Sequence, residues 1–243
     1  MLPMPRMLRS FALLLCAVGA ITPANAAGVR YALDPVHTRV MFAVEHAGFS
    51  RALGTVSGST GTLVFNPDDW ASAQIDARVP LARVDLGDEK WNRATLARNL
   101  LDAERFPEAR FVSTRVEPID ARRATVVGLL TLRGVTREVS LAVTLNALKR
   151  HPLPPFRQTV GFSATARISR SQFGIDAWKP VIGDEVELRL EVEATRSRAD
   201  AEVNEEGRSA DAGDPPAAPD AEPRQAIEPA DAGTQDPMPK PGQ

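Results

Sequence analysis

The segment EVELRLEVE, residues 185–193, alternates charged and aliphatic side chains without a break. Successive side chains of a β-strand point to opposite faces, so the aliphatic residues share one face and the charged residues share the other. A strand of this kind covers a dry interior on one side and meets water on the other. The segment therefore predicts a half-buried strand of an antiparallel sheet, the sheet type that tolerates one wet face.

The same period of two recurs along most of the chain. It is clear at residues 39–45 and again at residues 74–81. Glycine and proline residues separate further predicted strands, at about residues 53–66, 109–117, 122–132, 135–147 and 158–169. Together with residues 185–193, these segments give eight predicted strands.

One stretch has a helical pattern instead: Asp88 as the N-cap, followed by residues 89–101. One short helix among eight alternating strands predicts an all-β fold, an antiparallel barrel or sandwich, and argues against a doubly wound α/β fold. A membrane barrel would carry two aromatic girdles, yet aromatic residues make up only 5% of the chain and Tyr31 is its one tyrosine. We therefore expect a barrel with its apolar face inside and no membrane-spanning segment.

The first 26 residues have the order of a secretory signal peptide. Arg6 and Arg9 precede an apolar run at residues 11–21, and small residues end at Ala26, where we expect cleavage. Cleavage removes Cys16, the only cysteine, so the mature chain would form no internal disulfide. A lipoprotein anchored through Cys16 is disfavoured, because a leucine precedes it where a small residue is needed. Export without an anchor or a disulfide predicts a periplasmic protein.

Residues 199–243 consist mainly of proline, alanine and acidic residues, which bury too little apolar surface to offset the entropy of ordering. Eleven acidic and three basic residues give this segment a net charge of −8. The whole chain carries −2 and residues 1–26 carry +2, which leaves +4 for residues 27–198. The predicted organisation is a signal peptide at 1–26, one barrel domain at 27–198 and a disordered acidic tail at 199–243. A domain with so small a positive charge is not expected to bind nucleic acid.

Five blocks of the barrel domain match one known family in order. They are LDPVHT at 33–38 with the apolar alternation that follows it, GTLVFNP at 61–67, FPEARFVST at 106–114, GLLTLRGVT at 128–136, and ISRSQFGI at 168–175 followed by GDEV at 183–186. In these blocks the chain resembles the YceI-like, polyisoprenoid-binding, lipocalin-like proteins. It departs from their pattern at Thr38, where serine is usual, and around residues 93–96 and 100–102, where acidic, histidine and paired phenylalanine residues are missing.

The resemblance implies an eight-stranded lipocalin-like barrel that holds a long isoprenoid lipid, such as a polyprenyl phosphate or a quinone tail, without catalysis. The alternation by itself leaves two interpretations open, because eight strands can enclose either a filled core or one ligand. If the resemblance holds, the apolar faces line the ligand tunnel; the predicted lining residues are Val40, Phe42, Val44, Ile75, Val79, Phe111, Leu130, Phe162, Ala164, Ile168, Phe173, Leu188 and Leu190.

Three cationic or titratable residues are candidates for contact with a ligand head group. His37 is either a structural hydrogen-bonding residue, which we favour, or a residue that grips a phosphate. Arg133 and Arg170 are either lip residues near an anionic head group or, as the commoner case, solvated arginines at turns.

Candidates for chemistry are few. His37 and His46 are nine residues apart, so on one regular strand they would face opposite sides and could not share a metal ion. The sequence contains no Gly-x-Ser-x-Gly nucleophile elbow. We expect no enzymatic activity, no metal and no cofactor other than a bound isoprenoid lipid. The alternative is a periplasmic accessory protein that docks on a membrane redox or envelope enzyme; a homodimer is a further expectation.

Overall fold

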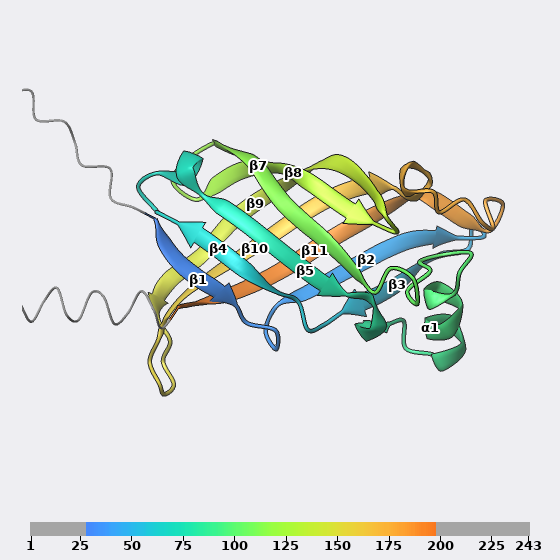
Figure 1. The fold of residues 1–243 in the computed structure, drawn as a ribbon, viewed down its shortest axis with the longest axis horizontal. Helices are drawn as coiled ribbons and strands as arrows, with labels where there is room; N and C mark the ends of the chain where they lie inside the picture. Colours follow the sequence, from blue (N-terminus) through green and yellow to red (C-terminus); the bar gives the residue numbers. More distant parts are fainter. Residues whose placement is uncertain (1–27, 198–243) are drawn as a thin grey trace, which may run out of the picture. The chain divides into compact units, whose positions relative to one another are not determined.

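The computed structural model describes residues 28–197, which form a closed antiparallel barrel with one α-helix at its end (Figure 1). The predicted signal peptide and acidic tail lie outside the described residues. The strands are β1 (Val29–Leu33), β2 (Arg39–His46), β3 (Ser50–Val56), β4 (Thr60–Phe65), β5 (Gln74–Pro80), β6 (Val84–Asp85), β7 (Glu108–Pro118), β8 (Arg123–Leu132), β9 (Val135–Arg150), β10 (Gln158–Ser169) and β11 (Ile182–Arg196).

The sheet closes because β11 pairs with two strands that lie end to end along it. Leu33 of β1 stands opposite Ala194, and Arg39 of β2 stands opposite Glu191. The next two positions around the barrel are each divided in the same way. In the first of them, β4 pairs with β1 and β3 pairs with β2. In the second, β5 pairs with β4 and β6 pairs with β3. Three broken strands and the five continuous strands β7 to β11 therefore make eight positions around the barrel. The predicted eight-stranded antiparallel barrel with one short helix is confirmed.

The breaks lie at residues 34–38, 57–59 and 81–83. The backbone N–H of Gly58 donates to the carbonyl of Pro35 at 3.1 Å, which joins the first two breaks. Gly58 has a φ of +79°, a left-handed conformation that suits glycine. The Thr38 hydroxyl, which is buried, donates to the Glu193 carbonyl at 3.1 Å and so ties the first break to β11. Side-chain and loop hydrogen bonds thus replace the ladder where it is interrupted.

Helix α1 (Glu89–Leu96) begins as predicted but ends five residues earlier than the predicted residue 101. Its N-cap is Asp88, whose side chain accepts hydrogen bonds from the backbone N–H groups of Lys90 and Trp91 at 2.9 and 3.1 Å. The chain becomes extended at Ala97, and a series of turns follows. These turns let Leu100 and Leu101 pack against a buried cluster of the barrel, a tertiary contact that outweighs helix propensity.

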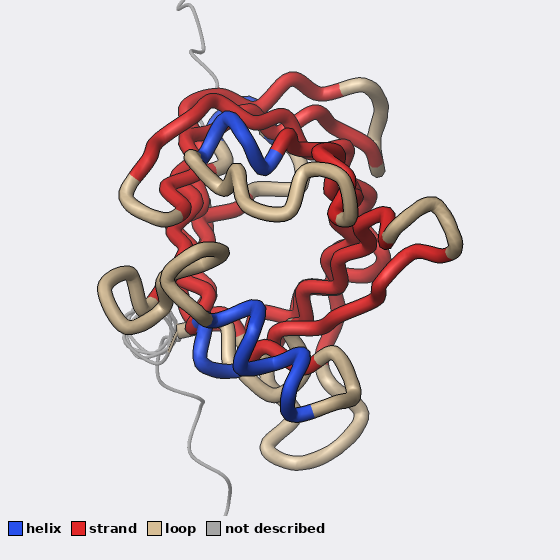
Figure 2. Tube along the Cα trace, turned by 90° about the vertical axis from the view of Figure 1, so that its right-hand side faces the viewer, coloured by secondary structure: helices blue, strands red, loops and turns tan. Residues whose placement is uncertain are grey.

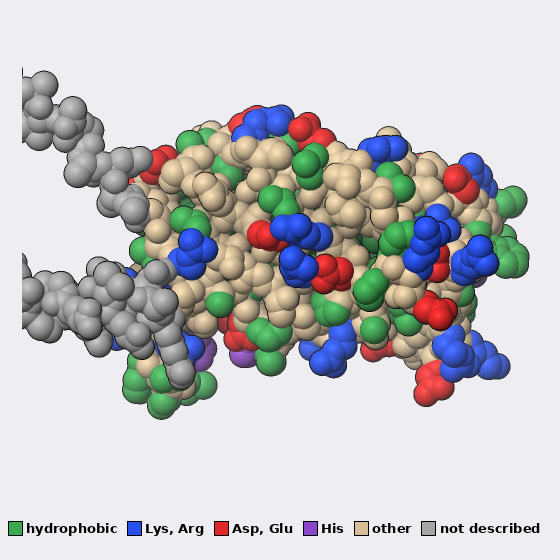
Figure 3. All heavy atoms as spheres, viewed as in Figure 1, with side chains coloured by type: hydrophobic (Ala, Val, Ile, Leu, Met, Phe, Trp, Pro, Cys, Tyr) green, Lys and Arg blue, Asp and Glu red, His purple; other side chains and the backbone are tan. Residues whose placement is uncertain are grey.

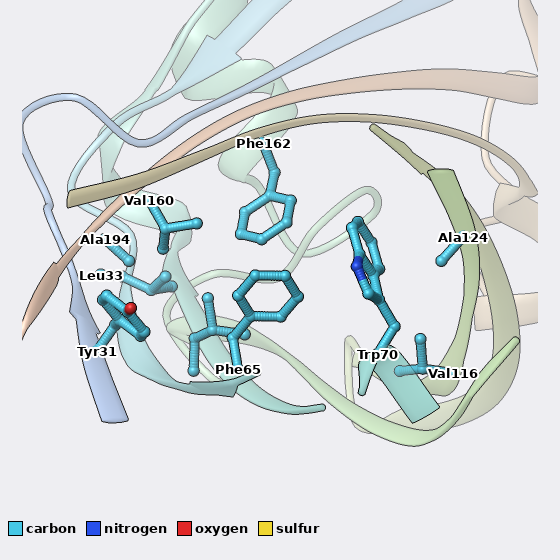
Figure 4. Close-up of a cluster of buried hydrophobic side chains, with 10 residues drawn as sticks. Tyr31, Leu33, Phe65, Trp70, Val116, Ala124, Val160, Phe162 and Ala194 are labelled. Atoms are coloured by element: carbon cyan, nitrogen blue, oxygen red, sulfur yellow. The ribbon is translucent and has the colours of Figure 1, made fainter. Parts of the chain in front are cut away.

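Two buried apolar clusters stabilise the barrel. The first surrounds Phe65, Trp70 and Phe162, whose rings pack edge to face with centroids 5.1 to 6.1 Å apart (Figure 4). Trp70 belongs to a short 3-10 helix, Trp70–Ser72, between β4 and β5. The second cluster surrounds Leu81 and Phe173 and includes side chains from the turns after α1. Figure 2 looks into the barrel from the end that carries α1, with the strands arranged around the axis.

Candidate ligand-binding cavity

The barrel encloses a cavity of about 770 Å³, within the range of about 300–1,000 Å³ typical of ligand pockets. Every strand from β1 to β11 contributes to its lining, and almost all of the lining side chains are apolar. The inward-facing residues are those of the period-two faces, because alternate side chains of each strand point into the barrel. An apolar interior that is this large and unfilled is suited to a hydrocarbon ligand.

Twelve of the thirteen predicted lining residues do line this cavity: Val40, Phe42, Val44, Ile75, Val79, Phe111, Leu130, Phe162, Ala164, Ile168, Leu188 and Leu190. Phe173 does not. Strand β10 ends at Ser169 and a 3-10 helix, Arg170–Phe173, follows it, so the alternation that turns Ile168 inward does not continue. Phe173 is 1% exposed and packs with Leu81 in the second buried cluster.

Aromatic side chains close one end of the cavity. Phe65, Trp70 and Phe162 line it, whereas Tyr31 and Val160, which belong to the same buried cluster, do not reach it. The aromatic trio is therefore the boundary between the cavity and a filled core. Figure 4 shows the three rings close together within the buried cluster. Phe65 follows the alternation of β4 and could have been found from the sequence, but Trp70 lies in a 3-10 helix that no strand pattern predicts.

The other end of the cavity reaches the surface beside α1. Here the lining includes His46 at the end of β2, Trp91 and Thr95 of α1, and Trp178 in the loop before β11. Trp91 is 43% exposed and Trp178 is 60% exposed, so the lining is continuous with the outer surface. The ring of His46 contacts the ring of Trp91 in a tilted arrangement, with centroids 5.2 Å apart and an interplanar angle of 43°. We call this opening the mouth. No residue of α1 is fully buried, and the helix contacts the core through Leu96, which packs against the second buried cluster.

Three small residues of the barrel, Gly128, Gly161 and Ala164, differ in whether they leave space in the cavity. Gly128 lies under the ring of Phe111, where an added Cβ would come within 2.5 Å of that ring and of the Val112 carbonyl. Gly161 does not line the cavity, because its buried neighbours Val160 and Phe162 take the inward positions. Ala164, which is 5% exposed, does line the cavity, and a short side chain there leaves volume unfilled.

Arg170 is the one arginine that lines the cavity, but it is not a solvated turn residue. It is 5% exposed, and its guanidinium donates hydrogen bonds of 2.6 to 2.9 Å to four backbone carbonyls, those of Ile175, Ala177, Ile182 and Gly183. Four of its five N–H groups are therefore engaged within the protein. Arg170 holds the loop between β10 and β11 in place at the mouth, and the prediction of a solvated arginine is wrong.

Arg133 lies outside the cavity lining. It occupies the tight turn between β8 and β9 with a φ of +51°, followed by Gly134 at +73°, the left-handed pair that hairpin turns of this kind require. Its guanidinium donates to the carbonyls of Gly174 and Arg98 at 2.6 and 3.0 Å. The side chain thus connects three segments of the chain.

His37 also lies outside the main cavity, in the break between β1 and β2, and pairs with Asp34. The ring Nδ1 is 2.8 Å from the Asp34 carboxylate, and this hydrogen bond and the carboxylate charge raise the pKa of His37 above 6.5. Burial raises the pKa of Asp34, but hydrogen bonds from His37 and from the backbone N–H of Val36 and His37 outweigh it and lower that pKa below 3.8. The placement matches the structural interpretation of His37.

The pair predicts a small pH dependence of stability. Because folding raises the pKa of His37, its stabilising contribution is complete below pH 6.5 and is lost as the pH rises through the raised value. The ring is 56% exposed, so we expect the melting temperature to fall by no more than about 2 °C from this cause. Thermal melts of wild type and His37→Gln at a series of pH values measure it. Parallel curves for the two proteins would contradict this interpretation.

Within residues 28–197, no three His, Cys, Asp or Glu side chains are grouped so that they could hold a metal ion. His37 precedes β2 and His46 ends it. The hydroxyl of Ser113 accepts a hydrogen bond of 3.0 Å from the backbone N–H of Ile75. This bond links β5 to β7 where the register of β7 shifts, so the role of Ser113 is structural. No helix within the described part of the chain is long and apolar enough to cross a membrane.

Known proteins are similar to this chain in sequence or in fold. A UPF0312 protein of Yersinia enterocolitica is 30% identical over 185 residues, which cover 74% of this chain and 95% of the relative. Among solved structures, Burkholderia cenocepacia BcnA is similar with a TM-score of 0.60 and 24% identity, covering 66% of this chain and 98% of that one. A polyisoprenoid binding domain from Saccharophagus degradans, described as implicated in plant cell wall breakdown, is similar with a TM-score of 0.53 and 13% identity, covering 70% and 99%.

These identities to solved structures are low and show the fold alone. The family assignment comes from the sequence: the model of the YceI-like domain matches residues 31–194, from the middle of β1 almost to the end of β11. This span takes in all eight positions of the barrel, the cavity and the mouth. The chain therefore belongs to the family of proteins with a YceI-like domain.

Proposed function

We propose that this protein is an exported, periplasmic binding protein that carries or stores a long isoprenoid lipid in the barrel cavity, without catalysis, metal or further cofactor. The observation that carries the proposal is the shape and chemistry of the cavity: apolar on all sides, closed by aromatic rings at one end and open at the other. The polyisoprenoid binding domain from Saccharophagus degradans, which shares the fold, supports an isoprenoid over other hydrocarbons. Export rests on the sequence of residues 1–26.

The geometry suits a chain-like ligand. Strands β9 and β11 are 16 and 15 residues long, against about 5–6 residues for an average strand. At about 3.4 Å per residue such strands extend for roughly 50 Å, which makes the barrel long relative to its width. A flexible hydrocarbon chain can follow such an interior from the mouth to the aromatic end.

The energetics also favour a long chain. Removing hydrocarbon from water gains about 0.8 kcal/mol for each CH₂-sized group, so about 25 buried carbons gain about 20 kcal/mol. Association costs an estimated 4–15 kcal/mol in lost freedom. A short chain therefore binds weakly, whereas a chain of several isoprene units binds tightly. The only ionisable residues in the lining are Glu45, His46 and Arg170, so charge contributes little along the chain itself.

Loading of the stripped protein tests the proposal. Full-length mature protein is freed of lipid in detergent and then incubated with polyprenols of increasing length; native mass spectrometry counts the chains bound. We expect one chain per protein, an affinity that increases with length, and less than about a twofold change between low and high salt, because screening acts on charges and not on hydrocarbon. Affinity that does not increase with length, or that is lost in high salt, would contradict the proposal.

The sequence analysis gave a second interpretation, an accessory protein that docks on a membrane redox or envelope enzyme, and it also led us to expect a homodimer. Both stay predictions of the sequence, since no feature of the described residues favours either of them over the carrier.

A further inference from the structure

Exposed apolar side chains surround the mouth of the cavity. Phe49 is 93% exposed, Trp178 60%, Trp91 43% and Val181 37%, and we call these four residues the mouth rim. Three of them also line the cavity, so the apolar surface continues from the interior to the outside. Hydrophobic side chains reach the surface at the right-hand end of Figure 3, the end where Figure 1 places α1.

The rim comes from three segments that the fold holds together. Phe49 lies in the turn between β2 and β3, Trp91 in α1, and Trp178 and Val181 in the loop before β11. The backbone N–H of Ala47 donates to the carbonyl of Val181 at 2.6 Å, which joins the first segment to the third. The contact between the rings of His46 and Trp91 joins the first segment to α1. The rim is therefore a built surface and not a scatter of separate side chains.

The rim carries charges of both signs. Asp85 and Asp88 accept hydrogen bonds from neutral N–H groups and keep their negative charge, Glu45 lines the cavity beside His46, and Asp176 forms an ion pair with Lys179 at 2.9 Å. By contrast, the exposed side chains of Lys90 in α1 and Arg98 in the turn after it form no ion pair within residues 28–197. Lys90 directly precedes Trp91 in α1, and Arg98 lies in the turn after that helix, so both cations can meet anionic head groups.

We propose that the mouth rim docks on the surface of a lipid bilayer, so that the hydrocarbon chain passes between membrane and cavity without crossing water. This inference rests on the proposed function, because it assumes that the cavity takes up a chain whose source is a membrane. Tryptophan side chains favour the boundary between head groups and acyl chains, since one end of the ring is apolar and the other carries an N–H. Apolar area together with cations is the combination that binds proteins to anionic membrane surfaces.

The opposite end of the barrel provides a comparison. The loop between β9 and β10 also exposes apolar side chains, Leu153 at 64% and Phe156 at 50%, next to the basic residues Arg150 and Arg157. The cavity, however, is closed at that end by the aromatic trio. Docking through this loop would give membrane binding without access to the cavity. Variants at the two ends of the barrel therefore distinguish docking at the mouth from docking at the loop.

Vesicle binding by the full mature protein tests the inference, with vesicles of phosphatidylcholine alone and vesicles that also contain phosphatidylglycerol. Phe49→Ser should reduce the vesicle-bound fraction about tenfold or more, as expected from losing one inserted aromatic side chain. The matched control, Phe156→Ser, should bind within about twofold of wild type. The double variant Lys90→Gln, Arg98→Gln should lose the preference for phosphatidylglycerol, because it lacks the two available cations.

Fluorescence shows which residues enter the membrane. Vesicles with brominated acyl chains should quench the emission of the wild type, and Trp178→Phe should remove a large part of that quenching, since Trp70 is buried. Wild type that does not bind vesicles, or binding that is lost in Phe156→Ser and kept in Phe49→Ser, would overturn the inference. Binding of a soluble protein through the rim, with no vesicle binding, would also overturn it.

Lipid loading tests the proposed function and vesicle binding tests the docking surface, so either one can fail without the other. Phe49 does not line the cavity, so Phe49→Ser should load polyprenol from detergent as the wild type does. Wild type that binds vesicles but takes up no polyprenol would contradict the proposed function alone. Wild type that loads polyprenol but does not bind vesicles would contradict the docking surface alone.

Discussion

Replacement of Ala164 by phenylalanine should remove most of the bound lipid while the barrel stays folded. Ala164 lies in β10, paired with Val143 of β9 and Leu190 of β11, and its side chain lines the cavity. A ring at this position would occupy the path of the chain. Because the cavity measures about 770 Å³, the ring enters open space, and the cost to stability should not exceed the 1–3 kcal/mol or so of an overpacked core.

The lipid extracted at equal amounts of folded protein should fall at least about fivefold in Ala164→Phe, since each carbon excluded from the interior costs about 0.8 kcal/mol. The next residue of the strand provides the control: Thr165 is exposed and does not line the cavity, so Thr165→Phe adds the same ring outside. Circular dichroism and thermal melts establish that both variants are folded. Equal lipid in Ala164→Phe and wild type would show that the chain does not pass Ala164.

Replacement of Arg170 by alanine should produce a large loss of stability. Four buried or half-buried backbone carbonyls would lose their donor, and each unsatisfied group costs about 1–3 kcal/mol, so we expect a loss of at least about 3 kcal/mol in the free energy of unfolding. The loop at residues 175–183 would also lose its main attachment at the mouth. Urea denaturation measures the change.

The matched control is Arg167, an exposed arginine near the end of β10. Arg167 is 67% exposed and forms ion pairs of 3.6 and 3.2 Å with Glu185 and Glu187. Ion pairs of this exposure contribute about 0–1 kcal/mol, so Arg167→Ala should change stability by less than about 1 kcal/mol. If Arg170→Ala were as stable as Arg167→Ala, Arg170 would not be the residue that holds the loop.

The sequence predicted most of the architecture because alternation is a local signal. The eight predicted strands correspond to the eight barrel positions, and the strand predicted at about 53–66 appears as β3 and β4 with a break at residues 57–59. Strands β1 and β6 and the breaks beside them were missed, because they depend on hydrogen bonds between distant segments, such as the one from Gly58 to Pro35. The end of α1 was missed because tertiary packing of Leu100 and Leu101 decides it.

The cavity was predictable in its lining but not in its existence. Alternation identified inward faces, whereas the decision between a filled core and a tunnel depends on which rings meet which small residues across the strands. Phe42 stands opposite Gly54 in the β2–β3 pair and covers it, and Phe111 covers Gly128. Such pairs follow from strand register, which one sequence does not reveal.

Arg170 and Phe173 were misplaced for a related reason. Both lie in the 3-10 helix that follows β10, where the strand period no longer determines which side chains face inward. A buried arginine that binds four carbonyls also leaves no local signal, because its partners lie 5 to 13 residues further along, in the loop before β11 and at the start of that strand.

In the living cell, we expect the cavity to hold one long isoprenoid chain. Native mass spectrometry of the protein purified from its own host, followed by extraction and identification of the bound molecule, measures whether it does. The predicted result is a 1:1 complex whose extra mass is that of a single lipid with a repeating isoprene chain. A protein that arrives with no bound molecule and cannot be loaded, or one that carries a small polar compound instead, would contradict this expectation.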